Sequence, residues 1–139
     1  MSLFNAIDVA ATSLEAQSVR LNTISSNLAN ANSVTNDPNT AYRAQYVVFE
    51  TVYRDAMGES DGVSAGVEVS DVVLSDLPPR KEYLPSHPMA DEEGFIYRST
   101  VNSVEEMANM IEASRSYQSS VEAMNTTKQL ILRTLTLGR

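Results

Sequence analysis

The chain of 139 residues contains no cysteine, no tryptophan and a single histidine, His87. Without cysteine it cannot form a disulfide, a thiolate metal site or a thiol nucleophile. One histidine also excludes a metal site built from several histidines of one chain. Basic residues are scarce, with 10 lysines and arginines against 18 acidic residues. The net charge of −8 argues against nucleic acid or an anionic lipid surface as the partner.

Long hydrophobic runs are absent as well. No stretch of about 20 apolar residues occurs, so we expect no membrane-spanning helix. The N-terminal segment lacks a basic stretch followed by a continuous apolar run, and we therefore expect no cleaved signal peptide. Apolar residues still make up 42% of the chain, which is too many for a wholly disordered protein.

The acidic excess lies entirely in the middle of the chain. Residues 1–49 carry three acids and two bases, a net charge of −1. Residues 50–93 carry eleven acids and three bases, a net charge of −8. Residues 94–139 carry four acids and five bases, a net charge of +1. The sequence therefore divides into a near-neutral head, an acidic centre and a near-neutral tail.

The head carries a seven-residue repeat that predicts a long helix from Leu3 to Ala31. Its apolar residues occupy the a and d positions of about four heptads, the pattern of a helix lying along another helix. One seam contains Ile7, Leu14, Leu21 and Leu28, and the other contains Leu3, Ala10, Gln17, Ile24 and Ala31. The remaining positions are mostly small and uncharged, which fits either a core helix or a helix packed between subunits.

The centre predicts short strands and turns. We expect strands at residues 42–53, 67–74 and 94–97, and Pro78-Pro79 breaks the chain before the run at 80–84. In the first of them, alternation places Val47, Phe49 and Thr51 on one face. Asp61-Gly62 is a turn signal. This small β-rich insert is near the lower size limit for a stable core of its own.

The tail predicts a second long helix over residues 103–136, with Gly138 as the expected stop. Residues 102–106 contain two overlapping capping boxes. Ser114 and Lys128 interrupt the apolar seam, so the isolated helix pair should be weak. The apolar residues at 3-4 spacing are Met107, Met110, Tyr117, Val121, Met124, Ile131 and Leu135.

The two helices have matched lengths and lie at opposite ends of the chain. We therefore predict an α+β fold in which N- and C-terminal helices form an antiparallel coiled-coil-like pair with a small β-rich insert between them. The predicted regions are an N-terminal helix and Asn-rich linker (1–41), an acidic β-rich centre (42–101) and a C-terminal helix (102–139).

Two groups of acids and a methionine stripe have both a chemical and a structural interpretation. Glu105 and Glu106 could form a carboxylate pair, but acids in a first helical turn ordinarily interact with the helix dipole. Met107, Met110 and Met124 could line a promiscuous binding groove, although core or subunit packing is commoner. The sequence contains no P-loop, no G-x-G-x-x-G and no triad pattern, so we expect no cofactor and no enzymatic activity.

The loop around His87 is the other candidate. His87 with the acids at 91–93 could bind a metal or act as an acid–base pair, but a hydrogen-bonded turn is the commoner arrangement. Pro85 and Pro88 fix two φ angles, which stiffens the loop. We expect a structural clasp in which Asp91 braces the turn before Gly94.

The segment at the end of the predicted N-terminal helix closely resembles the signature of bacterial flagellar rod and hook proteins. Its residues are Ser26, Asn27, Leu28, Ala29, Asn30, Ala31 and Asn32. The resemblance covers essentially the full length, and the chain length and the His-Pro loop point to a proximal rod member. Further similar segments are the opening MSLFN, residues 42–50, residues 85–95, residues 106–117 and the ending TLTLG.

This resemblance implies a structural subunit of the flagellar basal-body rod. Such proteins are exported through the flagellar type III system without a cleaved signal, and they assemble helically in the periplasm into a hollow drive shaft that transmits torque. The implied partners are further copies, other rod proteins, and the junction protein to the MS ring and export gate, with no nucleic acid or small-molecule substrate. The helices are expected inside, around the export channel, and the acidic centre outside.

Three alternatives stay open at this point. Another short rod protein would share the signature. A small acidic type III secretion chaperone or adaptor would share the size and charge, but should fold as a stable dimer when purified alone. A metal-dependent enzyme built around His87 would need further ligands, for which the sequence offers only carboxylates.

Overall fold

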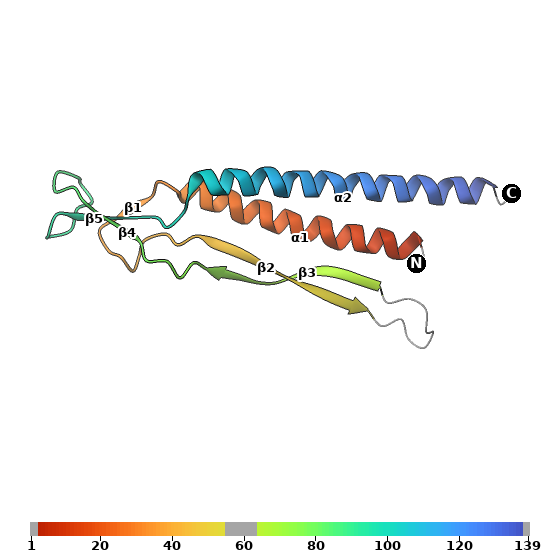
Figure 1. Ribbon diagram of the computed structural model, residues 1–139, viewed down its shortest axis with the longest axis horizontal. Helices are drawn as coiled ribbons and strands as arrows, with labels where there is room; N and C mark the ends of the chain where they lie inside the picture. The colour runs from red at the N-terminus through yellow and green to blue at the C-terminus, as the bar shows by residue number, and fades with distance from the viewer. Residues whose placement is uncertain (1–2, 55–63, 138–139) are drawn as a thin grey trace.

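The computed structural model describes residues 3–54 and 64–137 and shows a long, narrow molecule (Figure 1). In this part of the chain two helices, α1 (Leu3–Asn30) and α2 (Ser103–Leu137), run antiparallel along the long axis. Between them in sequence come β1 (Val34–Thr35), β2 (Gln45–Arg54), β3 (Ser64–Leu74), β4 (Arg80–Tyr83) and β5 (Phe95–Arg98). The predicted α+β class with two terminal helices is confirmed.

The strands form two separate antiparallel sheets. β2 and β3 make a long two-stranded ribbon, and β1, β5 and β4 pair in that order in a small three-stranded sheet. The ribbon runs along α1, so that α1 lies between α2 and the ribbon, and the small sheet lies beyond the start of α2 (Figure 1). The two-residue strand β1 was not expected, because so short a segment carries no alternation pattern.

The other boundaries agree closely with the sequence. The helices predicted over residues 3–31 and 103–136 are present, and so are strands near all three predicted positions. β4 falls on the run that follows Pro78-Pro79. The expected helix stop at Gly138 and the expected turn at Asp61-Gly62 lie outside the described residues.

A β-bulge interrupts the pairing of β2 with β3. The register shifts between Val48 and Phe49, and the extra residue is Ser70 of β3. Val47 and Phe49 line one pocket beside α1, in agreement with the face that they share by prediction. Thr51 is exposed, and Val52 lies toward α1 in a second pocket. A pattern of strict period two cannot anticipate one extra residue in the partner strand.

Small and polar side chains fill the contact between α1 and α2. Three pairs of side chains meet across it: Asn27 and Glu106 at 3.2 Å, Arg20 and Glu112 at 3.5 Å, and Ser13 and Ser120 at 3.0 Å. Their spacing of about seven residues along each helix shows that one face of α1 follows one face of α2. Ala113 of α2 is fully buried there.

The side-chain pairs between the helices lie one residue away from the predicted leucine seam of α1, whereas Ala10 and Ile24 of its companion seam are buried. Ser13, Arg20 and Asn27 each precede a predicted seam leucine, so Leu14, Leu21 and Leu28 lie at the flank of the contact and are half-buried. In α2, Glu106, Ala113 and Ser120 likewise precede Met107, Ser114 and Val121. Small residues allow the helices to approach closely, whereas the sequence pattern was read from the apolar residues alone.

Replacing Ala113 by leucine should destabilise the helix pair. Ala113 is 0% exposed, so a larger side chain must push the helices apart, at a cost of ~1–3 kcal/mol in the free energy of unfolding. Urea denaturation monitored by circular dichroism measures this loss. Ala123→Leu, on an exposed position of the same helix, is the control and should leave the unfolding midpoint nearly unchanged. Equal stability of both variants would contradict the tight contact.

Candidate assembly site

The side chain of Asn27 forms a buried junction with the start of β2. Asn27 is 0% exposed. Its Nδ2 donates to the carbonyl oxygen of Gln45 at 2.8 Å, and its Oδ1 accepts from the Gln45 backbone N–H at 2.9 Å. The amide therefore pairs with the Gln45 backbone in the way that a neighbouring strand would.

The same amide also connects α1 to α2. Asn27 Nδ2 donates to Oε2 of Glu106 at 3.2 Å, and the Tyr42 hydroxyl donates to Asn27 Oδ1 at 3.1 Å. The hydroxyls of Tyr42 and Ser26 lie 3.1 Å apart. Glu106 is only 3% exposed, so this carboxylate is buried in the junction rather than placed at the helix surface. One asparagine thus joins the end of α1, the start of β2 and the first turn of α2.

The backbone around Ala44 extends the junction to the other strands. The Ala44 N–H donates to Oγ1 of Thr100 at 2.9 Å, and its carbonyl accepts from the Ser75 N–H at 2.7 Å. The Thr100 N–H donates to the carbonyl of Tyr42 at 3.2 Å. Ile96 of β5 is completely buried in the small sheet. The ends of both sheets are therefore tied to the same place as the helices.

The other signature residues divide between this junction and the surface. Asn30 donates from Nδ2 to the carbonyl of Ser26 at 2.8 Å, near the last turn of α1. Leu28 and Ala31 are half-buried, whereas Ala29 and Asn32 are exposed. In the sequence, only the resemblance to rod and hook proteins singles out Asn27. The sequence pattern predicts no more than a capping or helix-dipole role for Glu106. Of the two predicted capping boxes, the one that begins at Asn102 supplies the observed cap of α2, since Asn102 Oδ1 accepts from the Val104 N–H at 3.2 Å.

Replacing Asn27 by alanine should destabilise the whole fold. The change leaves the Gln45 backbone and the Glu106 carboxylate without a partner, at ~1–3 kcal/mol for each buried group, so we expect a loss of about 3 kcal/mol. Urea unfolding measures it, with Asn22→Ala on the exposed face of α1 as the control. Asn27→Asp should cost more, because it places a like charge beside Glu106. A loss no larger than that of Asn22→Ala would contradict the junction.

The loop between β4 and β5 is held by side chains that accept backbone hydrogen bonds. His87 is half-buried, and its Nδ1 accepts from the Met89 N–H at 3.1 Å. Asp91 Oδ1 accepts from the N–H groups of Glu93 and Phe95 at 3.0 and 2.7 Å. Pro85 and Pro88 lie in the turns that these bonds brace. The clasp role of the loop in assembly stays a prediction.

Gly94 closes this loop in a conformation that other residues rarely adopt. Its φ is 83°, and a Cβ there would lie 2.9 Å from the Tyr83 ring and 3.1 Å from Cβ of Pro85. The Gly94 N–H donates to the Asp91 carbonyl at 3.0 Å, and its carbonyl accepts from the Leu84 N–H at 2.9 Å. Glycine is therefore required where the loop returns into β5.

Hydrogen bonds, chiefly from the Phe95 N–H, hold the pKa of the Asp91 carboxyl below its ordinary value of 3.8. The lowered pKa means that the charged carboxylate stabilises the folded loop. That contribution is present above pH 3.8 and is lost as the pH falls through the lower folded value.

Acidification should therefore loosen this loop. Below about pH 4 we expect the NMR shift of the Phe95 amide proton to move toward the value of a weakly bonded amide, as Asp91 is protonated. Asp91→Asn removes the titrating group and should abolish this change. Glu92→Gln, at an exposed position of the same loop, should retain it. A pH-independent Phe95 shift in the unmodified chain would contradict this role of Asp91.

Among residues 3–54 and 64–137, no three histidine, aspartate or glutamate side chains come together as metal ligands. Neither described helix is long and apolar enough to cross a membrane.

The predicted seam residues differ in their exposure. Ile24 of α1 is buried, and Ile7 is half-buried like the three seam leucines. The half-buried seam residues of α2 are Met110, Val121, Met124 and Ile131. Its exposed ones are Met107, Tyr117 and Leu135.

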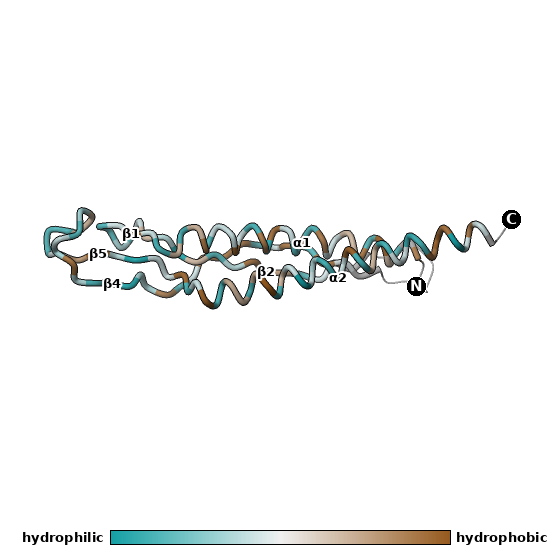
Figure 2. The backbone as a smooth tube through the Cα atoms, turned by 90° about the horizontal axis from the view of Figure 1, so that it is seen from above, coloured by the Kyte–Doolittle hydropathy of each residue, from teal (hydrophilic) through white to brown (hydrophobic). Residues whose placement is uncertain are grey.

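One face near the start of α2 is both apolar and open. Val104, Met107 and Ile111, at positions i, i+3 and i+7, are 75, 57 and 56% exposed. We call these three residues the outward stripe. Hydrophobic residues recur along α2 toward its C-terminal end (Figure 2). α1 is the only described element that packs against α2, and it covers a different face.

Two family descriptions match the ends of this chain. "Flagella basal body rod protein" matches residues 7–36, which contain most of α1 and the Asn27 signature. "Flagellar basal body rod FlgEFG protein C-terminal" matches residues 92–137, which contain α2. The chain is similar to flagellar basal-body rod proteins over its whole length, and it belongs to the flagellar basal-body rod protein family.

Several similar proteins carry the description "Flagellar basal-body rod protein FlgC". The one from Escherichia coli O6:H1 is 47% identical over 139 residues, covering all of both chains. The one from Salmonella typhimurium strain LT2 is 45% identical over the same full length. The one from Bacillus subtilis strain 168 is 31% identical over 150 residues, again covering all of both chains.

These comparisons confirm the predicted structural subunit of the basal-body rod. The family is one of structural proteins, so the expectation that the chain is not an enzyme is confirmed by membership. Membership also supports assembly with other rod components in the basal body. The secretion chaperone and the His87 enzyme are set aside by the full-length identity to rod proteins.

Proposed function

We propose that this rod subunit packs against further copies and other rod proteins through the outward stripe of α2. The observation that carries this proposal is the exposure of Val104, Met107 and Ile111 on a helix against which only one described element, α1, packs. A helix exposed to water normally presents a polar face there, so such a stripe marks an interaction surface. The expected neighbour is a second long helix of a rod subunit.

The half-exposed seams extend the proposed contact along both helices. Leu14, Leu21 and Leu28 flank the α1–α2 contact and keep part of their surface open. Tyr117 and Val121 do the same on α2. The sequence predicts coiled-coil-like packing between the two helices of one chain. We propose that such packing also occurs between helices of neighbouring chains. A helix from a neighbouring subunit would cover these flanks and complete the burial of the seams.

The charge distribution supports the expected orientation in a hollow rod. The acids of the centre are exposed on the ribbon, the small sheet and their loops: Glu50, Glu68, Asp71, Asp76, Glu82, Glu92 and Glu93. The two helices are near neutral as regions of the sequence. We propose that the helices face inward and the acidic strands outward, toward solvent.

Location and export follow the family expectation. We propose that the chain reaches the periplasmic rod through the flagellar type III system without a cleaved signal. We also propose that it contacts the junction protein of the MS ring and export gate. The rod proteins to which the chain is 45–47% identical over its full length support this proposal.

Replacing Ile111 by aspartate should block rod assembly without unfolding the subunit. A charge in the stripe cannot be buried against a neighbour without a penalty of several kcal/mol. Because Ile111 is 56% exposed in the single chain, the midpoint of urea unfolding should be nearly the same for the variant and the unmodified chain. Motility and the amount of the chain in purified basal bodies are the measurements. Ser119→Asp, at another exposed position of α2, should swim normally. Normal assembly of the Ile111 variant would contradict the proposed contact.

A further inference from the structure

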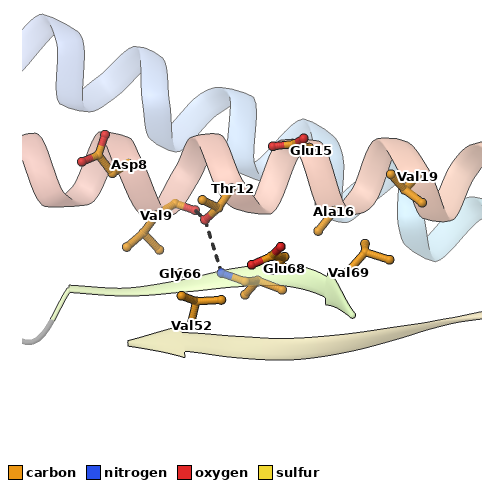
Figure 3. Close-up of a pocket in the computed structure, with 11 residues that line it drawn as sticks. Asp8, Val9, Thr12, Glu15, Ala16, Val19, Val52, Gly66, Glu68 and Val69 are labelled. Carbon is orange, nitrogen blue, oxygen red and sulfur yellow. Dashed lines mark hydrogen bonds between the residues drawn. The ribbon is translucent and has the colours of Figure 1, made fainter. Parts of the chain in front are cut away.

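A groove of about 340 Å³ lies between α1 and the β2–β3 ribbon (Figure 3). Thr12 holds its two walls together, since its Oγ1 accepts from the Val67 N–H at 3.3 Å. Gly66 allows this approach, because a Cβ there would lie 3.2 Å from Thr12 Oγ1. The groove is therefore a fixed feature of the contact between helix and ribbon.

The groove combines an apolar lining with acidic edges. Its apolar lining comes from Val9, Ala16 and Val19 of α1 and from Val52, Val67 and Val69 of the ribbon. Asp8 and Glu15 lie along α1 at one edge, and Glu68 lies on β3 (Figure 3). All three acids are exposed, and the ion pairs found among the described residues, Arg20–Glu112 and Arg98–Glu82, use other carboxylates. The groove thus suits an apolar segment that carries positive charge.

The C-terminal end of α2 has the complementary chemistry. No acidic residue follows Glu122, whereas Lys128, Arg133 and Arg139 do. Three leucines of this end, Leu130, Leu132 and Leu135, are 48, 53 and 67% exposed. We call residues 128–137 the α2 tip.

The tip extends beyond its own α1. Ser13 meets Ser120, so in an antiparallel pair Leu3 lies near residue 130 of α2. The last turns of α2 therefore pass the first described turn of α1, as Figure 1 shows at the C-terminal end. Lys128, Leu132 and Leu135, at positions i, i+4 and i+7, present one apolar and basic face of the tip.

We propose that the α2 tip of one copy docks into the acidic groove of a second copy of this chain. Leu132 and Leu135 enter the apolar floor, and Lys128 and Arg133 meet Asp8, Glu15 and Glu68. The occupant is assigned to a second copy because two chains of net charge −8 repel one another, and this pair of surfaces supplies the local complementarity that closes a contact. This inference rests on the proposed rod function.

The contact is heterologous, since tip and groove are different surfaces. Each copy keeps a free tip or a free groove after docking, so the contact can repeat without closing into a dimer. Repeated heterologous contacts produce open helical assemblies. A repeating contact between tip and groove is therefore of the kind that a helical rod requires.

Engineered cysteines test the contact, because the natural chain has none. One copy carries Glu68→Cys in the groove, and a second copy carries Leu132→Cys in the tip. Both are expressed together as the sole source of this chain in a flagellated host, and isolated basal bodies are oxidised. We expect a disulfide-linked dimer from this pair. Asp76→Cys paired with Leu132→Cys is the control and should give none, because Asp76 is exposed after β3 and does not line the groove.

Charge reversal supplies a second readout on the same cross-link. Asp8→Lys with Glu15→Lys in the groove copy should lower the yield of dimer about tenfold, and Lys128→Glu with Arg133→Glu in the tip copy should do the same. Combining the reversed groove with the reversed tip should restore the yield. A loss caused by misfolding would not be restored in this way.

The outcomes separate this contact from the rod function itself. If the chain is present in basal bodies but the disulfide-linked dimer does not form, the docking of a second copy is overturned and the rod function stays intact. This result is expected if another rod protein fills the groove. Equal cross-linking of the control pair would overturn it too. Absence of the unmodified chain from basal bodies would overturn both.

Discussion

The hydrogen bonds of one buried asparagine determine how the parts of this subunit are arranged. Asn27 satisfies both backbone groups of Gln45 and donates to Glu106 from the same amide. A buried polar group is tolerated only when its partners are in place, so the three segments can meet in essentially one geometry. The direction in which α2 and the ribbon leave the junction follows from that geometry.

Away from the junction, the contacts of α1 with α2 and with the ribbon bury few large apolar side chains. Ala10, Ala16 and Ala113 are among the buried residues, and the seam leucines remain half-open. A subunit built in this way has a defined shape but an incomplete core. Its remaining apolar surface is available to neighbours, and this division between a polar junction and open apolar flanks suits a protein that functions only in an assembly.

The sequence predicted the elements better than their contacts. Both helices have strong periodicity and appear where expected, because a long apolar repeat reports helix formation directly. The side-chain pairs between the helices lie one residue from the leucine seam, since Ser13 and Ser120 are polar and carry no apolar signal. The bulge near Phe49 and the partners of Asn27 depend on residues distant in sequence, which local patterns do not encode. The acidic groove is likewise not predictable from local patterns, because it forms only where α1 and β3 lie side by side.

The ribbon has a consequence for the subunit before it assembles. Among the described strands β2 and β3 pair only with each other, so each has one long edge without a strand partner. Side chains of α1 bond a few groups of these strands, namely both backbone groups of Gln45 and the N–H of Val67. Such edges are templates for intermolecular strand pairing and aggregation. Glu50, Glu68 and Asp71 stand exposed on the two strands. Copies approaching edge to edge therefore bring like charges together, and the acidic centre keeps free subunits from forming a continuous sheet.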